Sequence, residues 1–174
     1  FGNKYPRNNS NAGLGDWQVN AAKLPEGIDH IASYAHSKGL KFGIWIEPEM
    51  TNTRSELYEK HPDWVLKASE RDVVLGRGGT QVVLDLANPA VQDFVFGVVD
   101  NLMTSYPEID YIKWDANMSV QNHGSQYLTK DNQSHMYIEF HRGFEKICQR
   151  IRAKYPDLTI QACASGGGRA NYGV

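Results

Sequence analysis

The sequence predicts an α/β fold, in which short parallel strands are buried beneath helices packed on their outer side. Segments of strand character alternate along the chain with amphipathic helical segments, and the strand segments are short and largely apolar. That alternation is typical of βαβ units, whose strands are covered on both faces. The chain of 174 residues is long enough for one domain with its own core. Parallel strands, adjacent in this order, are expected over residues 40–46, 82–86, 109–114 and 158–162.

The first helix is predicted over residues 27–38, because apolar residues recur there at helical spacing and Gly39 follows as a stop signal. A short helix is expected over residues 55–60, and residues 63–66 are expected to be extended. A glycine-rich loop over residues 76–80 then leads into the second strand. The inward face of the first helix carries Ile28, Ile31, Ala32 and Ala35.

Two longer helices follow, each between two predicted strands, which is the position of a crossover helix in a parallel sheet. Asn88 supplies an N-cap and Pro89 a first-turn proline, and apolar residues then recur at helical spacing as far as Leu102. The last helix is expected over residues 134–154. Its inward-facing residues are Met136, Phe140, Phe144, Ile147, Cys148 and Ile151.

Polar residues follow three of the four predicted strands at their C-terminal ends. A doubly wound sheet would suit this number of strands, whereas a complete (β/α)8 barrel needs eight strands and usually about 250 residues. Chemistry at several strand ends is nevertheless characteristic of barrels. The run Gly76-Arg-Gly-Gly79 precedes a strand rather than a helix, so it does not indicate a dinucleotide site.

Composition excludes several classes of function. The net charge of −2 and the scattered basic residues do not indicate a nucleic acid partner, and no apolar run has the length of a membrane span. The six histidines show no ligand spacing, so neither a metal nor another cofactor is expected. Cys148 and Cys163 are expected to be free thiols, which leaves the cellular compartment open.

Asp115 is the strongest candidate for a catalytic residue. It stands where the strand Tyr111-Ile-Lys-Trp114 ends, and in parallel α/β proteins that end of a strand carries the chemistry. It could act as a nucleophile or a general base, or it could be a loop carboxylate paired with Lys113 on the same face. Lys113 could bind a substrate hydroxyl or form a Schiff base, as in a barrel lyase. The adjacent carboxylate keeps the lysine charged and so argues against the imine.

Other residues near strand ends have both a functional and a structural interpretation. Trp45 and Trp114 could pack in the core, or could offer a flat apolar face to a sugar ring. Glu47 and Glu49 could be an acid/base pair, or could form an ion pair with Arg54.

Two further features favour a structural role or leave the choice open. Asp85 lies within an apolar strand, where a structural hydrogen bond is the better interpretation because a buried unpaired carboxylate is costly. The run Gly166-Gly-Gly168 could let the backbone approach a ligand closely, or could satisfy unusual backbone dihedrals.

Six segments with distinctive motifs occur in order along nearly the whole chain. They are Leu14-Gly-Asp-Trp17, Phe42-Gly-Ile-Trp-Ile-Glu-Pro-Glu-Met50, His61-Pro-Asp-Trp64, Val83-Leu-Asp-Leu86, Tyr111-Ile-Lys-Trp-Asp-Ala-Asn117 and Cys163-Ala-Ser-Gly-Gly-Gly-Arg169. Together these segments resemble glycoside hydrolase family 36, the bacterial α-galactosidases, in which they have the same order. The resemblance implies that residues 1–174 are the central part of one catalytic domain, a partial (β/α)8 TIM barrel with outer helices.

The resemblance implies a retaining mechanism with Asp115 as the nucleophile that forms a covalent galactosyl-enzyme. In the family the paired aspartates that bind galactose lie before the segment that begins at Phe1, and the acid/base aspartate lies beyond Val174. The chain by itself is therefore expected to be inactive. The implied substrate-binding residues are Trp45, Arg77, Lys113, Asn117, Cys163, Gly166 and Gly167.

The implied substrates are oligosaccharides with terminal α-galactosyl groups, such as melibiose and raffinose. A transglycosylase of the same family and a non-catalytic galactose-binding module are the alternatives, and the parent enzyme could be a homo-oligomer. Met118, and Arg169-Ala-Asn171 after the glycine run, depart from the better-known members and suggest a different leaving-group preference. A sequon at Asn117 would place a glycan beside Asp115, so a bacterial cytoplasm or periplasm is expected.

Overall fold

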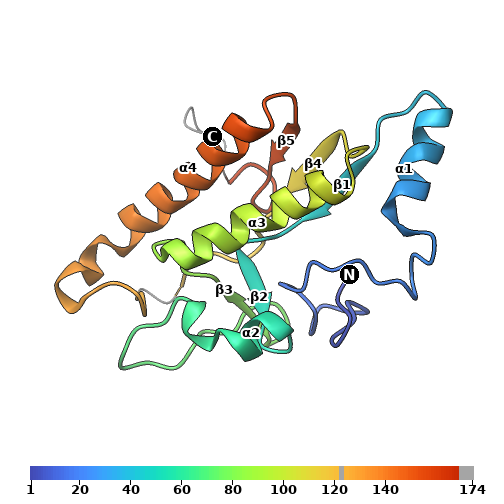
Figure 1. Cartoon of the computed structure of the whole chain (residues 1–174). Coiled ribbons are helices and arrows are strands. Elements are labelled where there is room, and N and C mark those ends of the chain that lie inside the picture. The colour runs from blue at the N-terminus through green and yellow to red at the C-terminus, as the bar shows by residue number, and fades with distance from the viewer. Residues whose placement is uncertain (122–123, 169–174) are drawn as a thin grey trace.

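The computed structural model describes residues 1–121 and 124–168, and it has a mixed α/β fold (Figure 1). Short strands alternate with helices, as the sequence predicts. Two 3₁₀-helices, Pro62–Trp64 and Lys130–His135, lie in the connections. The main elements in chain order are α1 (Gly27–Ser37), β1 (Gly43–Ile46), β2 (Met50–Asn52), α2 (Glu56–Lys60), β3 (Gln81–Val83), α3 (Pro89–Ser105), β4 (Tyr111–Trp114), α4 (Met136–Lys154) and β5 (Thr159–Ala162).

The main sheet is parallel and has the strand order β1-β4-β5. Helices α3 and α4 pack side by side across one side of it, as Figure 1 shows. Ile112 and Trp114 are buried on the helix-covered face, where the Trp114 ring meets Phe144 of α4 edge-on at a centroid distance of 5.8 Å. Because side chains alternate along a strand, Tyr111 and Lys113 point to the opposite face.

The expected strand over residues 82–86 is wrong in its place and direction. The strand observed there, β3, pairs antiparallel with β2 in a separate two-stranded sheet, so β4 lies directly beside β1. The apolar run Val82–Leu86 is indeed buried, but burial does not specify a partner. Its partner is β2, which follows β1 after the turn over residues 47–49, and β3 runs antiparallel to β2.

The helices lie where the sequence predicts them, apart from one or two residues at their ends. Ile31, expected on the inward face of α1, is instead 39% exposed. The side chain of Ser55 accepts a hydrogen bond from the backbone N–H of Tyr58, and Asn88 caps α3 through the N–H of Ala90. Helix α4 begins at Met136, after a 3₁₀ turn, rather than at residue 134. The expected extended segment 63–66 is wrong in part, because its first residues belong to the 3₁₀-helix Pro62–Trp64.

Asp85 has the structural role that the sequence favours. Its carboxylate is fully buried and accepts hydrogen bonds from the Ser125 hydroxyl and, at 3.0 Å, from the backbone N–H of Ala87. Burial raises the pKa of Asp85, against the lowering effect of these hydrogen bonds. Ser125 in turn accepts the N–H groups of Tyr127 and Leu128, so Asp85 anchors the long loop between β4 and α4.

Candidate active site

Asp115 and Cys163 lie next to each other at the C-terminal edge of the parallel sheet. Each directly follows its strand, β4 or β5. The backbone N–H of Asp115 donates to the carbonyl of Ile46 at 2.8 Å, and that of Cys163 donates to the carbonyl of Trp114 at 2.8 Å. These bonds continue the ladders of the sheet, so the prediction that Asp115 and Cys163 share one sheet edge is confirmed.

The carboxylate of Asp115 is held by hydrogen-bond donors that carry no charge. Oδ2 accepts the indole N–H of Trp45 at 3.1 Å and the side-chain amide of Asn117 at 2.6 Å. Oδ1 accepts the backbone N–H of Ala116 at 3.0 Å. The side chain is thereby fixed on both oxygens while it remains 8% exposed at the strand end.

These donors decide the charge of Asp115. Burial by itself would raise the pKa of this carboxyl. The hydrogen bonds from Asn117, Trp45, the Cys163 thiol and the backbone of Ala116 outweigh burial and lower the pKa to about 2. At neutral pH the group is therefore an anion and not a proton donor.

Asn117 connects the ends of three strands. Besides its bond to Asp115, its backbone N–H donates to Oε1 of Glu47 at 2.6 Å, and its Oδ1 accepts the hydroxyl of Ser165 at 3.2 Å. Glu47 follows β1 and Ser165 follows β5. The sequence predicts Asn117 as a site residue but gives no sign of Ser165. The positive φ of 48° at Ser165, which places it in a left-handed turn, appears only in the structure.

Glu47 and Glu49 are both buried, each with an exposure of 1%. Glu49 accepts the indole N–H of Trp114 at 2.7 Å, which ties the turn after β1 to β4. Of the two roles considered for Trp45 and Trp114, packing in the core and facing a ligand, each tryptophan therefore suits a different one. Trp114 is a core residue, whereas Trp45 lies against the candidate nucleophile on the other face.

Lys113 and Trp45 occupy paired positions of β4 and β1. Gln161 of β5 is the next partner of Lys113, so these three side chains form one row on the face opposite α3 and α4. Lys113 is half-buried, and the structure shows no ion pair between it and another described residue. Its position directly below Asp115 agrees with the predicted shared face.

An aromatic cluster that the sequence does not indicate extends from Trp45. Trp17 lies 6.1 Å from Trp45 and 4.7 Å from Phe1, measured between ring centroids. Among the described residues, Trp17 Nε1 is the buried side-chain donor without a hydrogen-bond partner. The sequence provides a weak signal, since Trp17 lies in one of the matching segments, but nothing in it relates Phe1 to Trp45.

Arg77, Gly166 and Gly167 are not among the hydrogen-bond partners of Asp115 described above. Arg77 is exposed in the glycine-rich loop with a φ of 40°, and its charge lies near enough to Arg7 to help lower the pKa of that guanidinium, after the larger effect of burial. Gly166 and Gly167 are exposed in the turn after Cys163. Gly166 has a φ of 100°, so this position favours glycine, and the space beside both residues is open. Residues 169–171 lie outside the described part of the chain.

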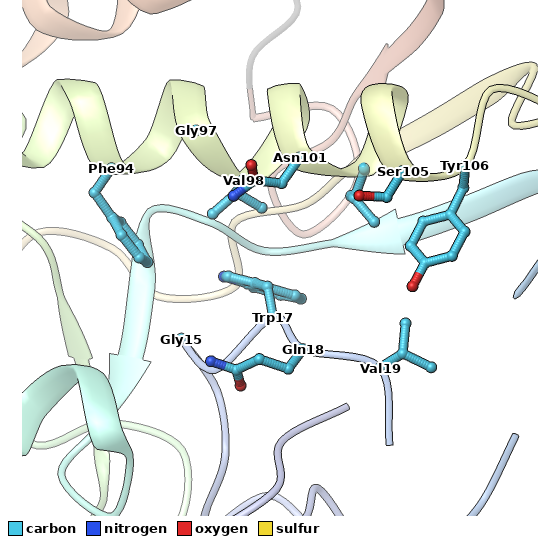
Figure 2. Close-up of a pocket in the computed structure, with 11 residues that line it drawn as sticks. Gly15, Trp17, Gln18, Val19, Phe94, Gly97, Val98, Asn101, Ser105 and Tyr106 are labelled. Carbon is cyan, nitrogen blue, oxygen red and sulfur yellow. The ribbon is translucent and has the colours of Figure 1, made fainter. Parts of the chain in front are cut away.

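One cavity is lined by residues other than these. It has a volume of about 500 Å³ and lies between the segment Gly15–Val19 and one side of α3 (Figure 2). Phe94, Val98 and Asn101 of α3 face Trp17 across it in Figure 2, and none of the predicted site residues lines it. Within residues 1–121 and 124–168, no group of three or more His, Cys, Asp or Glu side chains could hold a metal ion. No helix in the described part of the chain is long and apolar enough to cross a membrane.

Comparison with curated proteins finds relatives that share one activity in their names. Alpha-galactosidase 2 of Pediococcus pentosaceus is 40% identical over 97% of this chain, and AgaA of Geobacillus stearothermophilus is 38% identical over 97%. A fungal relative, Alpha-galactosidase C of Emericella nidulans, is 38% identical over the whole chain, so the resemblance is not confined to bacteria. The chain spans about 23% of the length of each of these proteins.

Solved structures agree with the sequence relatives. The α-galactosidase of Lactobacillus brevis superposes with a TM-score of 0.90 and 38% identity over 98% of this chain and 23% of its own. The GH36 α-galactosidase AgaA, as a variant solved in complex with raffinose, has a TM-score of 0.87 and 36% identity over 95% of this chain and 23% of its own. The model of one family, Melibiase, matches residues 1–174 in full. The chain therefore belongs to the melibiase family, that of the GH36 α-galactosidases.

Proposed function

We propose that this chain is the central part of the catalytic (β/α)8 barrel of a retaining α-galactosidase, with residues 1–174 forming part of that one domain. Family membership and the activity in the relatives' names support the reaction. The parallel strands β1, β4 and β5 with α3 and α4 on one side support the barrel, since this is the layered arrangement of its βα units.

The state of Asp115 carries the proposal. A nucleophilic carboxylate must be ionised and directed at the reacting carbon. Asp115 meets these needs through neutral donors, which hold its pKa at about 2 and fix both oxygens. In the reaction, one oxygen of Asp115 bonds to the anomeric carbon as the bond from that carbon to the leaving-group oxygen breaks. Water then hydrolyses the resulting ester and restores the carboxylate.

The leaving-group oxygen needs a proton from a second carboxyl group. Retaining glycosidases place this group about 5–5.5 Å from the nucleophile, where it first acts as an acid and then as a base. Glu47 and Glu49 do not suit this role, because each is 1% exposed and its carboxylate accepts a bond from Asn117 or Trp114. The acid therefore comes from a part of the full-length protein outside this chain.

The residues around Asp115 suit a galactose pocket. Lys113 can donate charge-assisted hydrogen bonds to sugar hydroxyls, and the flat ring of Trp45 can cover an apolar face of the sugar. The turn after Cys163 presents exposed backbone beside Asn117. The proposed sugar contacts are Trp45, Arg77, Lys113, Asn117, Cys163, Gly166 and Gly167.

The proposed substrates are oligosaccharides with terminal α-galactosyl groups, such as melibiose and raffinose. Structures of AgaA variants in complex with raffinose and with stachyose support this class. A family member that transfers the galactosyl group to an acceptor sugar would use the same nucleophile. Product analysis of the full-length protein with and without an acceptor sugar separates transfer from hydrolysis.

The decisive experiment concerns Asp115 in the full-length protein. Asp115→Ala should lower the rate of hydrolysis of nitrophenyl α-galactoside by at least about 10⁴-fold, about 5.5 kcal/mol of barrier. A mechanism-based fluorogalactosyl inhibitor should label Asp115, as found by mass spectrometry of the digested protein. A label on another carboxylate, or near-normal turnover by the variant, contradicts the assignment. Retained galactose binding without turnover in the unmutated full-length protein would indicate a binding module instead.

A further inference from the structure

Asn117 is positioned by its backbone as well as by its side chain. Its side-chain amide meets Oδ2 of Asp115 at 2.6 Å, and its backbone N–H meets Oε1 of Glu47 at the same distance of 2.6 Å. One bond thus holds the backbone of Asn117, and the other joins its side chain to Asp115. A shift of the backbone at Asn117 therefore moves the amide that directs Asp115.

Glu47 provides a rigid point for this contact. It follows β1 directly, in the turn that contains Pro48, and its side chain is 1% exposed. Its Oε1 also accepts the side-chain amide of Gln81 at 3.3 Å, and Gln81 belongs to β3 and is 1% exposed. The two sheets thus meet at the carboxylate of Glu47, one through β1 and the other through β3.

We infer that Glu47 is a positioning residue for the nucleophile: it fixes the backbone of Asn117 and so directs the Asn117 amide onto Oδ2 of Asp115. This inference rests on the proposed function, because it takes Asp115 to be the nucleophile. Glu47 itself has no contact with the sugar in this arrangement, since it is buried beneath Asn117.

The carboxyl group of Glu47 has a role that an apolar side chain of the same volume could not fill. Burial raises the pKa of Glu47, the charge of the nearby Asp115 acts in the same direction, and hydrogen bonds from Asn117 act against both. An apolar side chain would fill this volume without the cost of burying a carboxyl group. What an apolar side chain lacks is a strong acceptor for the Asn117 N–H, since a charged acceptor forms a shorter and stronger bond than a neutral one.

A double-mutant cycle in the full-length protein tests this link. The variants are Glu47→Gln, Asn117→Ala and both together, and Glu49→Gln is the matched control. Glu49 has the same residue type, the same 1% exposure and a place in the same turn, and it accepts a bond from Trp114. The readout is the rate at which the fluorogalactosyl inhibitor labels Asp115. Labelling forms the bond from Asp115 to the anomeric carbon while the activated leaving group departs with its electron pair, so it needs the nucleophile but little help from the acid.

Glu47→Gln should slow labelling by about 10-fold or more, because the neutral amide oxygen of glutamine is a weaker acceptor for the Asn117 N–H than a carboxylate. In the Asn117→Ala background the same change should slow labelling by less than about 3-fold, because coupled residues do not act independently. Glu49→Gln should give the same factor in both backgrounds. Multiplicative effects of Glu47→Gln and Asn117→Ala would overturn the inference. If Glu49→Gln and Asn117→Ala were as strongly non-additive as Glu47→Gln and Asn117→Ala, the inference would also be overturned. The slower labelling would then come from a general loosening of the turn.

Two additions keep the test decisive. If Glu47→Gln does not fold, as thermal melting would show, Glu47→Asp keeps the charge but withdraws it by one methylene, and the same non-additivity is expected. The activity of the Asp115→Ala variant is measured in parallel with the double-mutant cycle. An inactive Asp115→Ala with independent effects of Glu47 and Asn117 overturns this inference alone, whereas an active Asp115→Ala overturns the proposed function as well.

Discussion

The indole N–H of Trp45 donates to Oδ2 of Asp115 across 3.1 Å, from one strand of the sheet to the end of its neighbour. The two residues are far apart in the sequence and belong to β1 and to the end of β4. One side chain thus has two uses in the proposed site. It presents a flat aromatic ring beside the nucleophile, and it supplies one of the donors that keep Asp115 ionised.

Trp45→Phe separates these two uses, because phenylalanine keeps an aromatic ring and loses the donor. Loss of one hydrogen bond to a charged acceptor is worth about 1.5–3 kcal/mol, so kcat/KM of the full-length protein for nitrophenyl α-galactoside should fall at least about 10-fold. Trp17→Phe is the control, since Trp17 belongs to the same aromatic cluster and its Nε1 has no partner among the described residues. Equal losses in both variants would show that ring packing, not the donor, supports activity.

The stability of the folded protein should depend on the charge of Asp115 at low pH. The pKa of this group is about 2 in the folded state and 3.8 ordinarily, so the unfolded chain binds the proton more readily. The contribution of Asp115 to stability is therefore complete above pH 3.8 and is lost as the pH falls toward 2. Urea unfolding of the full-length protein and its Asp115→Asn variant from pH 6 to pH 3 measures this. As the pH falls, the unmutated protein should lose free energy of unfolding relative to the Asp115→Asn variant. A difference between the two proteins that stays constant with pH would contradict the charge assigned to Asp115.

Lys113→Met tests whether Lys113 binds the sugar. The substitution keeps much of the length of the side chain and removes its charge and its donors. We expect kcat/KM on an aryl α-galactoside to fall at least about 10-fold, even though the leaving group is activated, because charge-assisted bonds to the sugar are lost. A change within about 3-fold, under 1 kcal/mol, would make Lys113 a structural neighbour of Asp115 and no more.

Gly143 of α4 should not tolerate a side chain. A Cβ at this position would lie 1.9 Å from the carbonyl oxygen of Leu86, and backbone atoms cannot yield cheaply. Gly143→Ala in the full-length protein should lower the free energy of unfolding by about 1–3 kcal/mol or more, as overpacking does. Gly97→Ala is the matched control in α3, because a Cβ there meets nothing within 4 Å. It should stabilise by up to about 1 kcal/mol through helix propensity, and a loss of stability equal to that of Gly143→Ala would refute the argument from close approach.

The 174-residue polypeptide by itself should not hydrolyse galactosides, because it spans about 23% of the length of its relatives and the proposed acid lies elsewhere in the protein. General acid catalysis contributes about 10²–10⁴-fold, and an activated nitrophenyl leaving group reduces that need, which makes it the sensitive probe. Turnover of nitrophenyl α-galactoside near the rate of the full-length protein would contradict this expectation and mean that a carboxylate within this chain is the acid.

The sequence by itself determined the class of fold, the main helices and the edge of the sheet at which Asp115 and Cys163 lie. Strand-forming runs and helical spacing are local properties. A polar residue directly after a parallel strand must lie at the C-terminal edge of the sheet. Asp115 and Cys163 could therefore be placed together before any coordinates existed. The matching segments also fixed the family, because several motifs in order constrain more than composition does.

Only the tertiary structure decided which strands are neighbours and which side chains meet. The run Val82–Leu86 is apolar enough for a parallel strand, yet its first residues belong to β3, which pairs antiparallel with β2. The contacts of Trp45 with Asp115 and of Glu47 with Asn117 each join residues 70 positions apart. Such contacts depend on strand register and on which face a side chain takes, and both are set when the sheet packs against its helices. Local propensity has no information on either, so the charge and direction of Asp115 are properties of the folded chain.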